Sequence, residues 1–193
     1  MLENLKPERV FYYFEELTKI PRESGNEKAV SDYLYSVGKS LGLETIQDES
    51  NNIVIRKPAY KGYENHEPVV IQGHMDMVAE KADGVEHDFL VDPIPVIVDG
   101  DWVKTEGTTL GADDGIAVAM GLAILEDKEV KHPALEMLVT TDEERTMSGA
   151  RAVKRELLNG RKLLNIDAEE EGVLLSGCSG GHNVMGTLKV KFE

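Results

Sequence analysis

The chain has 193 residues, and 36 Asp and Glu against 21 Lys and Arg give it a formal net charge of −15 at pH 7. This acidic balance argues against a nucleic-acid backbone or an anionic membrane as the main partner. No apolar run approaches the roughly 18 residues of a membrane-spanning helix. The charged first turns resemble no signal peptide and the one cysteine cannot form an internal disulfide, so we expect a cytoplasmic protein.

The first half of the chain predicts two amphipathic helices followed by two strands. Apolar residues recur at helical spacing from Pro7 until Pro21 stops the helix. A second helix is expected to begin at Ser24, which forms a capping box with Glu27, and to end at Gly42. Runs of β-branched or apolar residues then predict buried strands at 52–56 and 68–72.

The second half alternates strands with helices. An Asp-Gly turn predicts a hairpin, and the nearly unbroken apolar character of 115–125 predicts a helix that is buried on all sides. A further amphipathic helix is expected at 148–158. The strands expected in this half cover 94–98, 102–105, 135–140, 162–166 and 172–176. Helices alternating with apolar strands predict an α/β fold with a mostly parallel, mixed sheet sandwiched by helices.

The last residues carry a different pattern. Apolar and polar side chains alternate from 184 to 192, as in a half-buried strand, directly after the glycine-rich stretch 177–181. We interpret that stretch as a hinge in which Cys178 is an inert thiol, because nothing nearby marks it as activated. A strand without a following partner indicates the first element of a second unit. We therefore expect one unit at 1–176 and the start of another at 177–193.

Side chains of the kind that bind metals follow four of the predicted strands. The four segments are Gly73 to Asp76, Gly111 to Gly115, Thr141 to Arg145, and Asn165 to Ala168. Each alone has a plain structural explanation: a surface ion pair, a pair of helix-capping carboxylates, or a solvated acidic loop. Because open α/β sheets bind ligands outside the carboxyl ends of their strands, the four together predict one site.

The residue types in these segments suit a metal-dependent hydrolysis. Asp76 can reach the imidazole of His74, since residues two apart in an extended chain face the same side, and a metal-bound histidine commonly donates its other N–H to a carboxylate. Of two adjacent glutamates, one can coordinate a metal while the other takes a proton from water. Oxygen-rich ligation with one imidazole suits Zn²⁺, Mn²⁺ or Co²⁺, and two such ions can share a bridging carboxylate.

The same segments resemble a known family. The stretches Gly73 to Val78, Gly107 to Gly115, Thr141 to Glu144 and Asn165 to Asp167 are similar to the co-catalytic zinc exopeptidases, in particular to their aminoacyl-histidine dipeptidase branch. The resemblance covers nearly the whole chain. It implies a zinc-exopeptidase-like fold and the metal-dependent hydrolysis of dipeptides or short peptides of the Xaa-His type.

The resemblance also implies a role for each matching residue. His74 and Asp167 would hold one zinc and Glu144 the other, while Asp113 would bridge the two, with a cis peptide bond to Asp114. Asp76 would orient His74. Glu143 would be the general base that activates a water bridging the two divalent ions, which are expected to be zinc, with manganese or cobalt as alternatives.

Members of that family are more than twice as long as this chain. They insert a lid and dimerisation domain after a glycine-rich hinge and then return to the catalytic domain with a second histidine ligand. The resemblance therefore implies that 1–176 is the N-terminal part of a catalytic domain, that 177–193 is the hinge and first lid strand, and that the return segment is absent. The parent enzyme would be a homodimer that takes small peptides. The alternatives are a truncated, non-catalytic metal-binding fragment that needs a partner chain, or a related amidase or deacylase.

Overall fold

The computed structural model describes residues 2–168, 172–177, 180 and 184–191. Two helices, five strands and then a mixture of helices and strands occupy the first 165 residues. In chain order the elements are α1 (Glu8–Thr18), α2 (Lys28–Ser40), β1 (Glu44–Gln47), β2 (Ile53–Lys57), β3 (Val69–His74), β4 (Val96–Asp99), β5 (Trp102–Thr105), α3 (Ala112–Glu126), β6 (Leu135–Thr140), α4 (Ser148–Ala152), the 3₁₀ turn η1 (Arg155–Leu157) and β7 (Lys162–Asn165).

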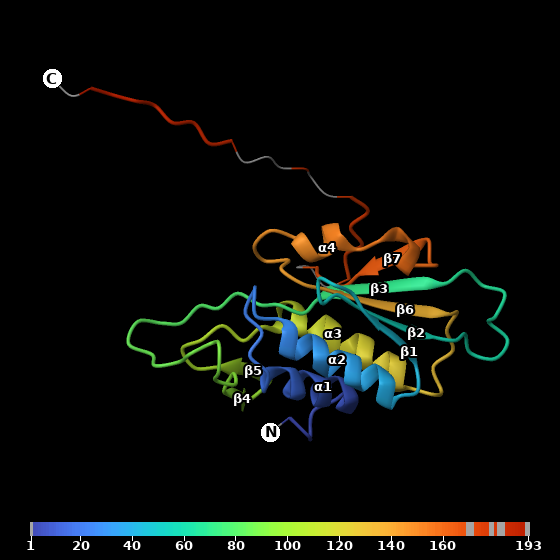
Figure 1. The fold of residues 1–193 in the computed structure, drawn as a ribbon. Coiled ribbons are helices and arrows are strands. Elements are labelled where there is room, and N and C mark those ends of the chain that lie inside the picture. Colours follow the sequence, from blue (N-terminus) through green and yellow to red (C-terminus); the bar gives the residue numbers. More distant parts are fainter. Residues whose placement is uncertain (1, 169–171, 178–179, 181–183, 192–193) are drawn as a thin grey trace.

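Five strands form one sheet in the order β1-β2-β6-β3-β7, and β4 and β5 form a separate hairpin. β3 runs parallel to both of its neighbours, with His74 opposite Thr140 of β6 and Gln72 opposite Asn165 of β7. β1 and β2 join the other side of β6 through antiparallel pairs. Helices α1, α2 and α3 cover one face of the sheet and α4 lies on the other (Figure 1). The expected mixed sheet between helices is confirmed.

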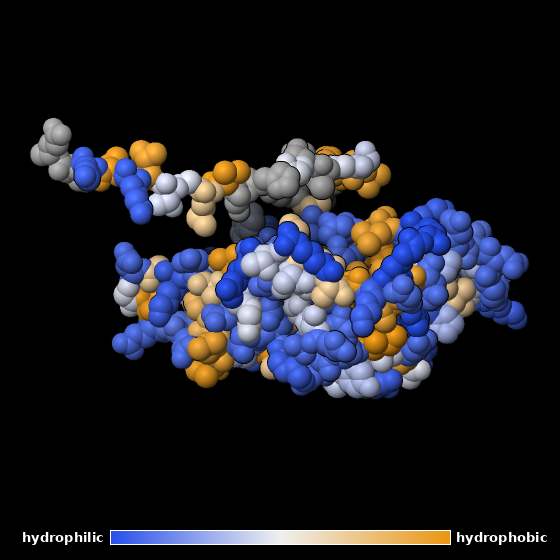
Figure 2. Space-filling model, turned by 45° about the horizontal axis from the view of Figure 1, so that its top comes forward, coloured by the Kyte–Doolittle hydropathy of each residue, from blue (hydrophilic) through white to orange (hydrophobic). Residues whose placement is uncertain are grey.

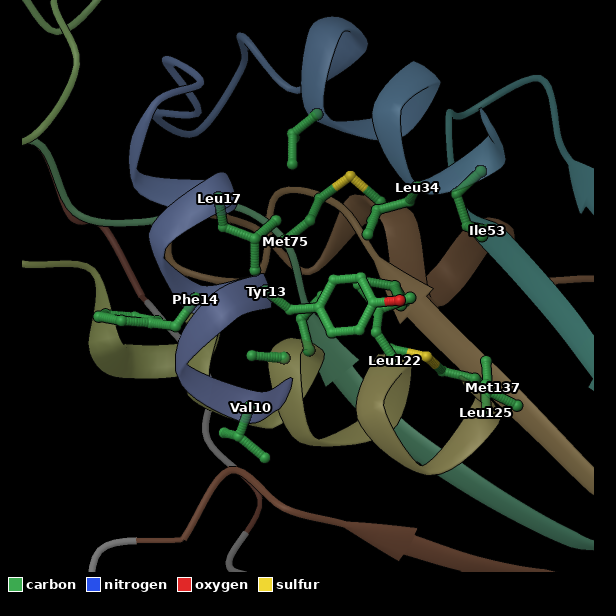
Figure 3. Close-up of a cluster of buried hydrophobic side chains, with 14 of the residues drawn as sticks. Val10, Tyr13, Phe14, Leu17, Leu34, Ile53, Met75, Leu122, Leu125 and Met137 are labelled. Carbon is green, nitrogen blue, oxygen red and sulfur yellow. The ribbon is translucent and has the colours of Figure 1, made fainter. Parts of the chain in front are cut away.

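The main core lies between the three longer helices and the sheet (Figure 3). Phe14 and Leu17 of α1, Leu34 of α2 and Leu122 of α3 are almost completely buried there, together with Ile53 of β2. Each such side chain contributes on the order of 1.5–3 kcal/mol through the apolar area that it removes from water. All six residues of β6 are buried, as expected for a strand covered on both faces. This core holds the carboxyl ends of β3 and β6 in fixed positions.

Several predicted boundaries differ from the structure. The helix expected at 148–158 ends at Ala152, and η1 follows, because Val153 and Leu157 pack on Val54, Val70 and Leu138 of the sheet. The expected capping box is not formed, since Glu27 makes no side-chain cap to α2. β1 lies in a stretch where no strand was expected.

Two further expectations concern burial. The helix expected to be buried on all sides leaves Met120 of α3 exposed. The strand expected at 172–176 is not formed, and Leu174 there is 96% exposed. Residues 184–191 contain no regular element and are exposed, while Phe192 of the expected strand lies outside the described residues. Cys178 of the expected hinge also lies outside them.

The surface is dominated by hydrophilic residues on the face drawn in Figure 2. Among the described residues, none of the helices is long and apolar enough to cross a membrane.

Candidate metal centre

The site lies where three parallel strands end. β3, β6 and β7 present their carboxyl ends at one edge of the sheet, as the sequence predicts for a ligand site. His74 is the last residue of β3, Glu143 and Glu144 come shortly after β6, and Asp167 comes two residues after β7. Asp113 reaches the same place from the first turn of α3. The structure therefore brings together residues from four separate segments of the chain.

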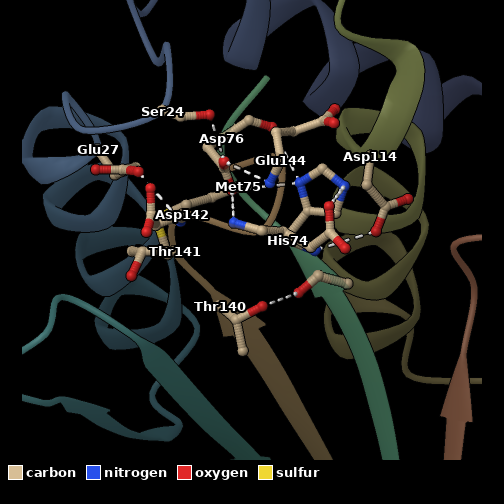
Figure 4. A network of polar contacts seen from close by, with 12 residues as sticks. Ser24, Glu27, His74, Met75, Asp76, Asp114, Thr140, Thr141, Asp142 and Glu144 are labelled. Carbon is tan, nitrogen blue, oxygen red and sulfur yellow. Dashed lines mark hydrogen bonds and ion pairs between the residues drawn. The ribbon is translucent and has the colours of Figure 1, made fainter. Parts of the chain in front are cut away.

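The imidazole of His74 is at the centre of this group (Figure 4). It is buried, with 1% of its surface exposed. Its Nδ1 lies 3.3 Å from Oδ1 of Asp76 and 3.1 Å from the carbonyl oxygen of Asp76. Its Nε2 lies 3.0 Å from Oδ1 of Asp113, 3.7 Å from Oδ2 of Asp167 and 3.9 Å from Oε2 of Glu143. With Nδ1 donating to Asp76, Nε2 is the nitrogen that faces the other carboxylates.

Asp76 connects His74 to the loop that carries Glu143 and Glu144. Its carboxylate is fully buried and accepts hydrogen bonds from the Ser24 hydroxyl at 2.7 Å and from the amides of Glu143 and Glu144 at 3.1 and 3.3 Å. Burial opposes the charge of this carboxylate, but the hydrogen bonds from His74, Ser24 and Glu143 lower the pKa of Asp76 to about 2. One side chain thus anchors both the imidazole and the loop that carries the two glutamates.

Asp113 and Asp114 lie at an irregular start of α3. Gly111 precedes the helix in a left-handed conformation with φ 68°, Asp113 and Asp114 both depart from helical geometry, and the peptide bond between them is cis, as the resemblance implies. The carboxylate of Asp113 is exposed and faces His74, whereas Asp114 is buried. Oδ2 of Asp114 accepts a hydrogen bond from the backbone amide of His74 at 3.1 Å. The two neighbouring carboxylates therefore contact the same histidine from different sides.

The charges of the site act on one another. Burial disfavours the imidazolium, but the hydrogen bond with Asp76 and the charges of Asp114, Asp76 and Asp167 raise the pKa of His74 to about 9. Burial, helped by the charges of Asp167 and Asp113, raises the pKa of Asp114 to about 7. Burial likewise raises the pKa values of Glu143 and Glu144, and the neighbouring carboxylates add to it. The carboxylates of the site are thus held close together against their mutual repulsion.

The donor set suits a divalent cation. Two groups of side chains each bring three donor atoms within 4.8 Å of one another, His74 with Asp113 and Glu144, and His74 with Asp114 and Asp167. Imidazole nitrogen with several carboxylate oxygens is a combination that Zn²⁺, Mn²⁺ and Co²⁺ accept. A second-sphere carboxylate on the histidine, here Asp76, is the usual companion of such a ligand. All six residues predicted from the sequence lie in or beside these groups.

Some residues of the site are not predicted by the sequence. The sequence assigns no role to Asp114, whereas the structure groups it with His74 and Asp167. Ser24 and Glu27, expected to cap α2, instead hold the glutamate loop: Ser24 through Asp76, and Glu27 by accepting the amide of Asp142 at 3.2 Å. No local pattern distinguishes these long-range partners from an ordinary capping box.

No family model matches the chain. It is 42% identical over 192 residues to the cytosol non-specific dipeptidase of Escherichia coli strain K12, an alignment that covers 100% of this chain and 40% of that protein. Among solved structures, the aminoacylhistidine dipeptidase of Vibrio alginolyticus matches with a TM-score of 0.86 and 42% identity over 89% of this chain and 35% of that one. A tripeptidase from Staphylococcus aureus matches with a TM-score of 0.71 and 26% identity over 84% and 43% of the two chains.

These three relatives are all peptidases that are named for short peptides, which defines the class of protein that the fold and the site resemble. Within that class, the motifs indicate a resemblance to the aminoacyl-histidine dipeptidases. The 42% identity to the Escherichia coli dipeptidase and the structural match to the Vibrio alginolyticus enzyme confirm this resemblance. All of this chain aligns with the Escherichia coli dipeptidase, but it spans only about two fifths of the length of that protein.

Proposed function

We propose that this chain carries most of the metal site of a peptidase that hydrolyses dipeptides or other short peptides, of the Xaa-His type. The observation that carries the proposal is the position of His74, whose Nδ1 is held by Asp76 while Nε2 faces Asp113, Asp167 and Glu143. The names of the similar proteins, two dipeptidases and a tripeptidase, support the same class of substrate.

Two divalent ions fit this donor set. His74 and Asp167 would hold one and Glu144 the other, with Asp113 shared between them, and zinc is the expected metal. Asp114 offers one more oxygen on the side of His74 and Asp167. When bound, the ions would polarise the scissile carbonyl and lower the pKa of the attacking water.

The chain's own residues would handle the proton and the geometry. Glu143 accepts a proton from the water as the water oxygen bonds to the carbonyl carbon. It returns that proton to the leaving nitrogen as the C–N bond breaks. Burial raises the pKa of Glu143 above its ordinary value, a direction that favours its holding a proton between the two steps. Asp76 keeps His74 in one tautomer and fixes the Glu143 amide at 3.1 Å, so it positions both a candidate metal ligand and the general base.

We also propose how this chain fits into a longer parent protein. Residues 1–176 would form part of the catalytic domain, and 177–193 the hinge and first strand of a lid domain through which the parent protein forms a homodimer. A cytoplasmic location is supported by the name of the Escherichia coli relative. The alternative is a chain that binds metal without catalysing alone, and one observation favours it: in the described residues, both candidate ligand groups share a single histidine.

The test is hydrolysis of Ala-His and β-Ala-His by the purified chain with added Zn²⁺ or Mn²⁺, with EDTA as control. Turnover that EDTA abolishes supports a chain that completes its own site. A folded chain that binds metal without turnover belongs to the alternative, and a folded chain that binds neither ion contradicts the metal site itself.

The shared ligand is tested separately by Asp113→Ala. We expect this variant to lose both ions, measured as metal content per chain after dialysis, because the carboxylate would be common to both. Retention of two ions per chain would remove Asp113 from the bridging position. Asp99→Ala is a matched control, since Asp99 of β4 is a similarly exposed acidic residue whose carboxylate pairs with Lys104 outside the donor set.

A further inference from the structure

A buried arginine contacts the loops that carry the candidate metal ligands and has no part in the mechanism above. Arg22, in the segment between α1 and α2, is 2% exposed. Taking a guanidinium out of water is costly unless hydrogen bonds replace those to water. A cation at this depth therefore needs hydrogen-bond partners, and the identity of those partners indicates what it does.

The hydrogen bonds of Arg22 run to two separate loops. Nη1 donates to the carbonyl oxygens of Met75 at 2.9 Å and Asp76 at 3.2 Å, and Nη2 donates to the carbonyl oxygen of Gly111. The first two carbonyls directly follow His74, and the third lies two residues before Asp113. One rigid, planar group thus spans the loop after β3 and the loop before α3.

The second loop is shaped to receive the guanidinium. A Cβ atom on Gly111 would lie 2.5 Å from Nη2 of Arg22, and one on Gly115 would lie 2.7 Å from the same nitrogen. Both distances are shorter than real Cβ contacts allow, so side chains at these two positions would displace Arg22. The close approach of this arginine is thus one reason for glycine at both positions, beside the left-handed backbone and the nearby Met77 at Gly111.

The charge of Arg22 also acts on the site. The carboxylates of Asp76, Asp114 and Asp113 all stabilise its cation, against the opposing effect of burial. The interaction is mutual, so a fixed positive charge offsets part of the repulsion among carboxylates that otherwise face one another.

We propose that Arg22 is a positioning residue that fixes the loop carrying His74 relative to the loop carrying Asp113, and so sets the spacing of the candidate metal ligands. The identity of those ligands rests on the proposed function, whereas the link between the two loops does not. Removing a group that orients metal ligands in this way typically lowers metal affinity by about 10- to 100-fold.

The test compares Arg22→Met with Leu34→Ala in the full chain. Met is uncharged and of similar length, and Leu34 is a fully buried core residue of α2 outside the site, so its truncation serves as a control for general loss of stability. Co²⁺ is the probe, because its visible spectrum reports both binding and coordination geometry. We expect Arg22→Met to lose at least about 10-fold in Co²⁺ affinity, and Leu34→Ala to keep the parent's affinity and spectrum despite a lower Tm.

Amide hydrogen exchange in the metal-free chain supplies the second readout. Arg22→Met is expected to accelerate exchange in the segments 74–78 and 107–115 together, while Leu34→Ala leaves these two segments unchanged relative to the rest. If the parent folds but binds no Co²⁺, the proposed metal site fails, and the exchange measurement still decides the role of Arg22.

Two outcomes would overturn the proposal. One is Co²⁺ affinity in Arg22→Met that equals the parent's, and the other is an equal loss of affinity in Leu34→Ala. Should Arg22→Met not fold, Arg22→Lys carries the test, because it keeps the charge while its single ammonium group cannot match the fork that contacts both loops. Parent-like affinity and exchange in the folded lysine variant would equally contradict the proposal.

Discussion

The two ends of β6 each carry buried or half-buried glutamates in opposite environments. At the amino end, Glu136 accepts hydrogen bonds from Nε of Arg56 at 3.0 Å, from the side chain and amide of Asn159 at 2.8 Å each, and from the amide of Gly160 at 2.7 Å. Beyond the carboxyl end, Glu143 and Glu144 face other carboxylates and one histidine.

The pKa directions express the same contrast. Burial alone would raise the pKa of Glu136, but its hydrogen bonds outweigh burial and lower it. Burial raises the pKa values of Glu143 and Glu144, and neighbouring carboxylates add to the effect. The donors around Glu136 compensate its negative charge without any ligand. Glu143 and Glu144 face carboxylates instead, and a bound cation would supply the compensating charge. The residue type alone does not distinguish the two ends of the strand.

The largest effect is expected at the carboxyl end. Glu143→Ala should lower peptide hydrolysis by about 10²- to 10⁴-fold in any active assembly, because the group that moves the proton is lost. Metal content should stay at the parent's level, since Glu143 is expected to be no ligand. Steady-state kinetics and metal analysis of the same preparation check both parts. Unchanged turnover would remove Glu143 as the base.

At the amino end, the effect should fall on stability alone. Glu136→Ala leaves Nε of Arg56 and two backbone amides without their acceptor, at an expected cost of about 3 kcal/mol in the free energy of unfolding. Urea denaturation measures the cost, and Co²⁺ titration should find an unchanged affinity. Weakened Co²⁺ binding in this variant would show that Glu136 also affects the metal site, and would contradict the proposed difference between the two ends of β6. Glu136→Gln, which keeps an acceptor, should cost less.

The smallest effect concerns the pH dependence caused by Asp114. Burial raises the pKa of Asp114 from 3.8 to about 7, so the folded chain holds this proton over a pH range in which the unfolded chain has lost it. The contribution of Asp114 to stability therefore falls as pH rises from about 4 through 7. Asp114→Asn removes that contribution and also weakens the support for the charged form of His74.

In EDTA, the Tm of Asp114→Asn should therefore rise relative to the parent's between pH 5 and pH 8. An advantage of about 1 kcal/mol corresponds to roughly 2–4 °C for a chain of this size. Thermal unfolding at the two pH values checks the sign. If the difference in Tm does not grow with pH, the pKa of Asp114 in the folded chain is not raised.

The sequence predicts the sheet, most of its strands and the convergence of the site, because these depend on local apolar patterns and on the rule that parallel strands end at one edge. His74, Glu143 and Asp167 could be placed together for that reason. Arg22, Ser24 and Glu27 could not, since their partners lie far away in sequence and an arginine after a proline resembles any surface loop. The helix expected through 158 fails for a similar reason, as tertiary packing of Val153 and Leu157 overrides the helical pattern.

Among the described strands, β7 lies at one edge of the five-stranded sheet. This strand pairs with β3 alone among the described strands, and all four of its residues are exposed. Asp167 follows this edge strand, whereas His74 and the glutamate loop extend from strands inside the sheet. Local fraying of four residues would carry Asp167 away while the remaining donors stay in place. An ion held by His74 and Asp167 would therefore leave at a rate set by the edge of the sheet, long before the chain unfolds.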